Sequence, residues 1–422
     1  MYEKTTLPNG VRVLTAPMPH VRSASVTLFF GVGSRYEAAE VAGISHFIEH
    51  MVFKGTVRYP SAQAISEAIE GIGGGFNGGT SKELTAYSAK VSATHLSVAL
   101  DVLLDMQRHP LFDVREIEKE RRVIIEELSM YQDSPQDWVG VLIDEAMWPN
   151  LPLGRDEAGT KETVSRLRRA MLLDYLARYY VPNNLVVSVA GNVTSQQVVE
   201  EVQRLTEGWP CGVVPEWTPC LPPRDVPRVR LAIRDTEQAN LCLATPGVAH
   251  NDPDYYAMAV LNGLLADGMS SRLFQEIRER QGLAYDISSY VTNYHETGSL
   301  VIYAGVDPSH TDAAIRTIVA ELGRLREELV PEPELRRTKE YVKGRIVLRL
   351  EETHNVASWL GGQEILRGEI MELDAALALV DAVAAEDVQR VAQRFFHDAD
   401  LRLALVGPFT DEDHFERLLH FE

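Results

Sequence analysis

The chain contains two copies of one sequence pattern, and this internal repeat limits its possible folds more than any other feature. Residues 175–194 recur 216 positions later, so that Arg178 matches Arg394. A second stretch, residues 89–99, recurs at residues 304–314 with an offset of 215. Two separate matches at about half of the chain length indicate a duplicated domain.

A proline-rich segment separates the two copies. Six prolines lie between residues 209 and 228. Proline blocks regular helix and central strands, so this segment is predicted to be an extended, semi-rigid linker. We therefore expect one domain at residues 1–208, a linker at 209–228 and a homologous domain at 229–422.

Strand-like and helix-like periodicities are mixed within each copy. In the first copy they predict strands at 11–17, 24–32, 83–91 and 185–193, and helices at 40–54, 61–71, 94–108, 114–133 and 165–180. In the second copy they predict strands near 239–245, 285–292, 298–305 and 401–407. Because helix pairs rather than single crossovers separate the strands, we predict an α+β fold. Each domain should contain a mixed, mostly antiparallel sheet packed with helices.

One predicted helix, at residues 40–54, carries His46, Glu49 and His50. Positions i, i+3 and i+4 share one face of a helix. Two imidazoles one turn apart can bind a single Zn²⁺, and the carboxylate between them can hold a water molecule that the metal activates. So short a match is also compatible with two histidines that only cap or pack the helix.

A third protein ligand for Zn²⁺ is expected from the charged helix predicted at 114–133. Glu120 and Glu127 are seven residues apart and therefore share a face of that helix. One of them can ligate the metal while the other orients a ligand histidine. Glu126 lies about 100° further round and is expected in solvent. Without the histidines, the run would be typical of a charged surface helix.

With these residues the chain resembles the inverted-motif zinc metallopeptidases, such as pitrilysin, insulin-degrading enzyme and the mitochondrial processing peptidase. The order His-x-x-Glu-His at residues 46–50 matches the motif of that family. The resemblance implies one Zn²⁺ per chain, Glu49 as the catalytic base, Glu127 as the third ligand and Glu120 as the carboxylate that orients a histidine. Glu126 stays the alternative ligand.

The resemblance extends to a glycine-rich segment, residues 73–81. It looks like the family's strand that pairs with the substrate backbone, which implies substrate contacts at Phe76, Asn77 and Gly78. The family usually has alanine where this chain has Gly78. The run also contains a Gly-x-Gly-x-x-Gly dinucleotide fingerprint, but here a helix pattern precedes and a strand pattern follows, the reverse of what nucleotide binding needs.

The second copy matches the family at Arg278 and Tyr285, an arginine–tyrosine pair that contacts substrate near the scissile bond. A guanidinium and a phenol are suited to stabilising a peptide carbonyl as it becomes an oxyanion. Adding 215 to the positions of the zinc motif gives Leu261, Leu264 and Leu265. We therefore expect chemistry in the first copy only.

The resemblance implies a zinc metalloendopeptidase that hydrolyses unfolded peptides in a closed chamber, with a zinc-bound water activated by Glu49. It fits the short, two-domain, bacterial-type branch, similar to the beta subunit of the processing peptidase, in which two subunits form a clamshell. By analogy, Arg278 and Tyr285 would act on the partner's site in a homodimer; a heterodimer with an inactive homologue is the alternative. The competing function is a non-catalytic core subunit or a peptide-holding partner, against which the presence of Glu49 argues.

Composition limits the partners. With 61 acidic and 41 basic residues, the net charge is −20, which argues against a nucleic-acid binder. An acidic chamber would favour basic peptides. No run of about 18 apolar residues is present, and the chain begins without an apolar leader. Three cysteines fit a reducing compartment. We therefore expect a cytoplasmic protein that binds no membrane.

Overall fold

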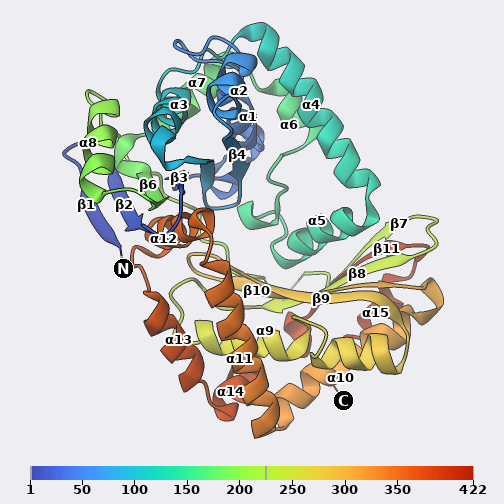
Figure 1. The fold of residues 1–422 in the computed structure, drawn as a ribbon. Coiled ribbons are helices and arrows are strands. Elements are labelled where there is room, and N and C mark those ends of the chain that lie inside the picture. The colour runs from blue at the N-terminus through green and yellow to red at the C-terminus, as the bar shows by residue number, and fades with distance from the viewer. Residues whose placement is uncertain (1, 224–225, 422) are drawn as a thin grey trace. The chain divides into compact units, whose positions relative to one another are not determined.

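The computed structural model describes residues 2–223 and 226–421 and forms two compact units (Figure 1). Unit 1 consists of Met1–Leu128, Asp156–Thr218 and Leu348–Glu372. Unit 2 consists of Ser129–Arg155, Pro219–Val347 and Leu373–Glu422. Each unit has one sheet covered by helices, which confirms the predicted α+β fold. Residues 224 and 225 of the predicted linker lie outside the described residues, as do residues 1 and 422 of the predicted domains.

The sheet of unit 1 has six strands in the order β1-β2-β6-β3-β5-β4. The strands are β1 (Glu3–Thr6), β2 (Arg12–Pro17), β3 (Ser23–Phe30), β4 (Gly75–Thr80), β5 (Thr85–Ser92) and β6 (Leu185–Gly191). The β2–β6 pair is parallel and the other pairs are antiparallel. Periodicity predicted β2, β3, β5 and β6 to within two residues at each end. It missed β1, since all four of its residues are exposed and polar.

The helices of unit 1 are α1 (Ile44–Val52), α2 (Ala62–Glu70), α3 (Leu96–Arg108), most of α4 (Val114–Asp133), α6 (Lys161–Arg166), α7 (Arg169–Tyr179), α8 (Ser195–Leu205) and α12 (Thr353–Arg367). The helix predicted at 40–54 is shorter than expected. It begins at Ile44 because Gly43 adopts a left-handed φ of 91°, which interrupts the helix after the 3₁₀ turn Ala39–Val41.

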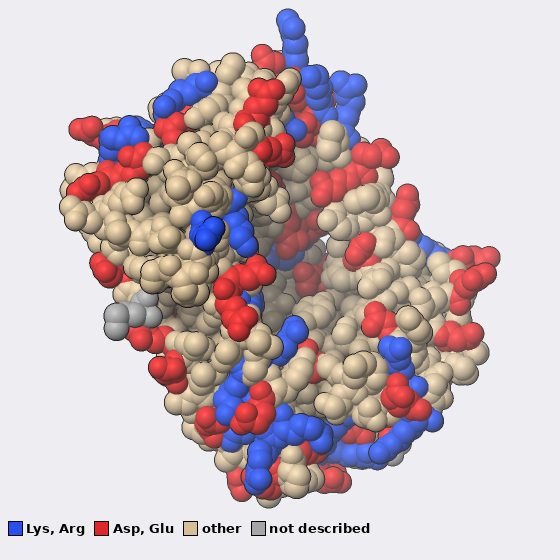
Figure 2. Space-filling view, in the orientation of Figure 1, with Lys and Arg blue, Asp and Glu red and all other residues tan. Residues whose placement is uncertain are grey.

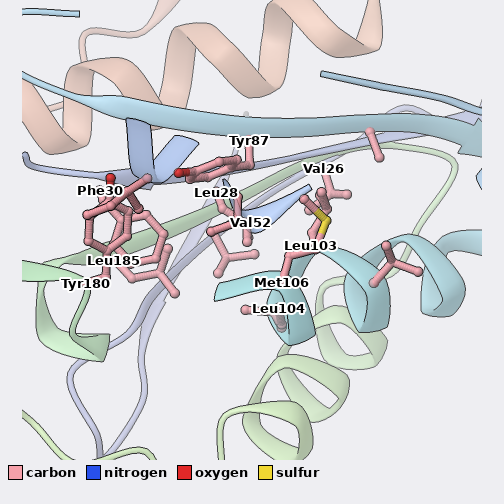
Figure 3. Close-up of a cluster of buried hydrophobic side chains, with 14 of the residues drawn as sticks. Val26, Leu28, Phe30, Val52, Tyr87, Leu103, Leu104, Met106, Tyr180 and Leu185 are labelled. Atoms are coloured by element: carbon pink, nitrogen blue, oxygen red, sulfur yellow. The ribbon is translucent and has the colours of Figure 1, made fainter. Parts of the chain in front are cut away.

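The core of unit 1 holds α1 against the sheet. Val52 of α1, Leu28 of β3 and Tyr87 of β5 point into one cluster of apolar side chains (Figure 3), and each is fully buried. Burial of an aliphatic side chain such as Val52 or Leu28 contributes about 1.5–3 kcal/mol to the stability of the fold. The buried face of α1 therefore fixes the rotation of this helix, and so the direction of the residues on its other face.

Unit 2 repeats the arrangement of unit 1. Its sheet has the order β7-β11-β8-β10-β9, in which β7 and β11 are parallel and the other pairs antiparallel, as in β2-β6-β3-β5-β4. The strands are β7 (Val229–Ile233), β8 (Ala239–Pro246), β9 (Ala284–Asn293), β10 (Gly298–Val306) and β11 (Arg402–Gly407). The helices are α5 (Pro135–Met147), α9 (Tyr255–Leu265), α10 (Thr311–Glu327), most of α11 (Glu332–Arg349), α13 (Leu373–Ala382), α14 (Ala385–Phe395) and α15 (Glu412–Glu416), with a π-helix at Phe274–Arg280.

Two helices pack on the sheet of the other sequence half. Helix α12, from the second half, covers β3 and β6 of unit 1, and α5, from the first half, covers β8 and β11 of unit 2. In unit 1, Leu360 of α12 lies in a cluster with Phe29 and Val186 on the sheet face opposite the main core. Each sheet needs both apolar faces covered, and the exchanged helix covers the second one. The compact units therefore differ from a linear division of the chain at 209–228.

This exchange predicts opposite effects at two adjacent glycines of α12. A Cβ at Gly361 would lie 2.3 Å from Cε2 of Phe29, whereas a Cβ at Gly362 has no atom within 4 Å. We expect Gly361→Ala to lower the free energy of unfolding by about 1–3 kcal/mol through overpacking. Gly362→Ala should raise it by up to about 1 kcal/mol through helix propensity. Urea unfolding followed by circular dichroism measures both, and equal changes would contradict the packing of α12 on β3.

Charged side chains of both signs are interspersed over the visible face of the molecule (Figure 2). Acidic residues nevertheless exceed basic ones by enough to leave a net charge of −20. No helix among the described residues combines the length and the apolar character needed to cross a membrane.

Candidate metal centre

Helix α1 begins at a buried carboxylate. The backbone N–H groups of Gly43 and Ser45 donate to Oε2 and Oε1 of Glu37 over 2.7 and 2.8 Å. Glu37 is buried, and a negative charge at a helix N-terminus is favoured by the helix dipole. A Cβ at Gly43 would lie 2.4 Å from the carbonyl oxygen of Ala158. Contacts from distant parts of unit 1 thus fix where α1 starts.

The face of α1 opposite its buried apolar residues brings together the three residues of the predicted zinc motif. The ring centres of His46 and His50 lie 4.6 Å apart, and Oε2 of Glu49 is 3.9 Å from Nε2 of His46. All three side chains are less than a fifth exposed. Within residues 2–223 and 226–421, this is the one group of three or more His, Cys, Asp or Glu side chains whose ligand atoms lie within 4.8 Å of one another.

Glu127 of α4 faces both histidines. Its Oε2 lies 3.6 Å from Nε2 of His50 and 3.9 Å from Nε2 of His46. Tetrahedral Zn²⁺ with bonds of about 2.1 Å requires ligand atoms about 3.4 Å apart. Both distances from Oε2 of Glu127 to the histidine nitrogens are therefore within about half an ångström of the spacing that a tetrahedral zinc site needs. Glu126, the alternative ligand, is exposed.

Glu120 lies on the other side of His50. Its Oε2 is 3.1 Å from Nδ1 of His50, and its Oε1 is 2.9 Å from Nζ of Lys54. A carboxylate on the second ring nitrogen of a ligand histidine fixes the tautomer and the direction of the ring. The two glutamates thus meet different nitrogens of His50, Glu127 at Nε2 and Glu120 at Nδ1. Their roles as ligand and orienting carboxylate stay predictions.

The pKa values of the two histidines shift in opposite directions. Burial, with the charge of His50 nearby, lowers the pKa of His46 to about 4. Burial also acts to lower the pKa of His50, but the hydrogen bond to Glu120 and the charges of Glu49 and Glu127 outweigh it, and this pKa is raised. His46 is therefore neutral at pH 7, as a metal ligand must be.

The carboxylates of the site are also perturbed. Burial raises the pKa of Glu49; the charge of His50 opposes this effect and that of Glu127 adds to it. Burial acts to raise the pKa of Glu120 as well, but its hydrogen bonds with His50 and Lys54 prevail, and this pKa is lowered. Glu120 is therefore held ionised, while Glu49 is shifted towards the range of a general base.

Strand β4 runs beside this site at the edge of the sheet. Ser81 N–H donates to the carbonyl oxygen of Leu84, towards β5. By the alternation of an antiparallel pair, the main-chain groups of Phe76, Gly78 and Thr80 then face the free edge. The N–H of Gly78 donates to Oδ1 of Asn77 over 2.9 Å.

Gly78 touches the predicted catalytic base. A Cβ at this position would lie 2.8 Å from both Oε1 of Glu49 and Cε2 of Phe53. Glycine in place of the family's alanine therefore leaves room for these two side chains against β4. The structure thus places Phe76, Asn77 and Gly78 on the edge strand nearest to Glu49.

Arg278 and Tyr285 belong to unit 2 and lie against each other. Arg278 is in the π-helix Phe274–Arg280, and Tyr285 follows at the start of β9. The guanidinium carbon is 4.8 Å from the centre of the tyrosine ring, which is 79% exposed. The pair therefore presents a cation and a phenol together on the surface of unit 2.

The positions of unit 2 that correspond to the zinc motif carry core side chains. Leu261, Leu264 and Leu265 lie on α9 and are at most 1% exposed. The same helix of the repeat thus presents chelating side chains in unit 1 and apolar ones in unit 2.

Two residues of the site were not predicted from the sequence. Lys54 is four residues after His50, so helical spacing could have placed it near the motif. Glu37 has no comparable signal, because it lies outside the helical period and reaches the start of α1 from before the 3₁₀ turn Ala39–Val41.

Comparison with known proteins gives matches over most of the chain. Residues 12–161 match the model of the insulinase family, peptidase family M16, and residues 166–342 match the peptidase M16 inactive domain. An uncharacterized zinc protease of Bacillus subtilis is 39% identical over 408 residues, which cover 97% of this chain and 98% of that protein. An uncharacterized zinc protease of Streptomyces coelicolor is 38% identical over 415 residues, which cover 97% of this chain and 90% of that protein.

Solved structures show the same fold. A protease from Helicobacter pylori has a TM-score of 0.92 at 24% identity, covering 97% of this chain and 99% of that one. A peptidase M16 inactive domain from Pseudomonas fluorescens has a TM-score of 0.89 at 17% identity, covering 97% and 98%. A chain of complex III2 from Candida albicans has a TM-score of 0.85 at 22% identity, with 99% of both chains covered.

Proposed function

Since the chain belongs to peptidase family M16, the insulinase family, we propose that it is a zinc-dependent endopeptidase that hydrolyses unfolded peptides. The observation that carries the proposal is the convergence of three ligand atoms, from His46, His50 and Glu127, beside the carboxylate of Glu49. The relatives named zinc proteases support the metal and the reaction class.

The three converging side chains would hold one Zn²⁺ per chain. When bound, this metal supplies Lewis-acid activation of a water molecule and of the peptide carbonyl. His46 suits this role because its lowered pKa keeps it neutral, and His50 because Glu120 holds its Nδ1. Glu127 would add the single negative charge of the ligand set.

Glu49 would act as the proton carrier. Its carboxylate takes a proton from the attacking water and later passes it to the nitrogen of the leaving amine. Burial raises its pKa, which brings its basicity closer to neutral pH. Its contact with Gly78 places it beside β4, so a peptide paired with the free edge of that strand would pass within its reach.

The first test is cleavage of a quenched, unstructured, basic peptide by the purified protein. We expect cleavage that a chelator removes and that added zinc restores. An acidic peptide of the same length, compared side by side, measures the preference expected from the net charge of −20. No cleavage by protein that binds zinc stoichiometrically would contradict the proposal and favour a non-catalytic core subunit or peptide-holding partner.

We further propose that the chain acts as a cytoplasmic homodimer in which Arg278 and Tyr285 serve the site of the partner. Complementation tests this arrangement. The Glu49→Gln and Tyr285→Phe proteins should each cleave the peptide only weakly when alone, since the first lacks the base and the second lacks an oxyanion donor. Mixed subunits should recover about a quarter of wild-type activity, because half of the dimers are mixed and each has one intact site. If the subunits exchange but no activity is recovered, action across the dimer is contradicted. If the purified protein is a monomer, the heterodimer with an inactive homologue is favoured.

A further inference from the structure

The carboxylate of Glu120 has a separate partner at each oxygen. Oε2 lies 3.1 Å from Nδ1 of His50, and Oε1 lies 2.9 Å from the ammonium of Lys54. The Glu120 side chain is only 8% exposed and that of Lys54 is 26% exposed. A continuous chain of contacts thus runs from Lys54 through Glu120 to His50.

His46 has no equivalent chain of contacts. Its Nδ1 is buried and has no hydrogen-bond partner within the part of the chain that the structure describes. No hydrogen bond at Nδ1 therefore fixes the direction of the His46 ring, whereas Glu120 contacts Nδ1 of His50. A residue that fixes Glu120 acts on one of the two histidines only.

The backbone holds Lys54 in place. Helix α1 ends at Val52, and the N–H of Lys54 donates to the carbonyl oxygen of Met51 over 3.1 Å. The next residue, Gly55, turns the chain with a φ of 128°, and its carbonyl oxygen accepts from the N–H of Leu111 over 3.0 Å. The lysine therefore starts from a fixed point at the end of the helix that carries the histidines.

Lys54 supplies what a buried carboxylate on another helix needs. Glu120 comes from α4, and an ionised oxygen buried without a partner is costly enough to make a side chain rotate towards another donor. The formal charges of Lys54, Glu49, Glu120 and Glu127 sum to −2. This value is equal and opposite to the charge of one divalent cation.

We propose that Lys54 is a positioning residue of the metal site. Its ammonium holds Oε1 of Glu120, so that Oε2 stays on Nδ1 of His50 and Nε2 of that ring stays directed at the metal. The inference rests on the metal site of the proposed function, but not on peptide hydrolysis.

The test uses the full chain loaded with Co²⁺ in place of Zn²⁺, because the visible absorption of Co²⁺ reports ligand geometry. We expect Lys54→Met to change this spectrum and to weaken Co²⁺ and Zn²⁺ binding about 10–100-fold, as outer contacts of metal ligands do. Lys54→Arg should restore the spectrum. Lys119→Met is the matched control, since this exposed lysine of α4 pairs with Glu116 and should leave spectrum and affinity unchanged. An unaltered spectrum, or an equal or tighter affinity in Lys54→Met, would overturn the proposal.

A double-mutant cycle with Glu120→Gln shows whether Lys54 acts through Glu120. The loss of affinity in Lys54→Met should almost disappear in the Glu120→Gln background, whereas additive losses would overturn the proposal. If circular dichroism shows that Lys54→Met is unfolded, Lys54→Gln gives the same cycle. If the two substitutions are coupled in their effect on metal affinity but the wild-type protein cleaves no peptide, only the proposed function is contradicted. If the protein cleaves peptide but the two losses of metal affinity are additive, only the inference about Lys54 is contradicted.

Discussion

Glu49→Gln should lower kcat for peptide cleavage by about 10²–10⁴-fold while the protein still binds one equivalent of zinc. The amide has nearly the same shape as the carboxylate but cannot accept a proton from water and pass it on. Since His46, His50 and Glu127 supply the ligands in our proposal, metal binding should survive. Steady-state kinetics and the metal content of the dialysed protein measure the two effects separately.

Glu40→Gln is the matched control for this experiment. Glu40 lies in the 3₁₀ turn before α1, is exposed and should change neither kcat nor zinc content. Loss of zinc together with activity in Glu49→Gln would make Glu49 a ligand rather than the base. Activity within a factor of ten of wild type would mean that another group accepts the proton.

Glu127→Ala should remove most of the zinc affinity, whereas Glu126→Ala should leave it within about twofold. Zinc binding to four-ligand protein sites is worth about 10–16 kcal/mol, so one ligand contributes about 3 kcal/mol, or on the order of 100-fold in affinity. Only Glu127 of this pair faces the histidines, at 3.6 and 3.9 Å, and Glu126 is exposed. Competition with a chromogenic chelator measures both dissociation constants.

The adjacent positions make this comparison sharp. Both substitutions remove one negative charge from the same turn of α4, so a general electrostatic effect on the cation would weaken binding equally in the two variants. A selective loss in Glu126→Ala would instead identify it as the ligand, the alternative that the sequence left open. Peptide cleavage should follow the zinc content in each variant.

Local pattern was enough to predict elements with a long and regular helical period. Helix α4 covers residues 114–133 as predicted, because a long run of charged and apolar residues at helical spacing has few competing structures. Helix α1 was predicted four residues too long at its start, because Gly43 and the carboxylate of Glu37 end the pattern early. Strand β4 lacked any hydrophobic period and was expected only from the family resemblance, since five of its six residues are glycine or carry small polar side chains.

The repeat, the α+β class and the chelating motif could all be derived from the sequence alone. Repetition and helical spacing are properties of the chain itself, so His46, Glu49 and His50 had to share a face wherever a helix formed. The tertiary structure decided which glutamate of α4 faces Nε2 and which faces Nδ1, and it brought Lys54 to Glu120. It also decided that α12, from the second half of the sequence, covers the sheet of unit 1, and that α5, from the first half, covers the sheet of unit 2. The physical reason is that periodicity shows which face of a helix is apolar, whereas the choice of the surface that buries it depends on contacts between residues far apart in the chain.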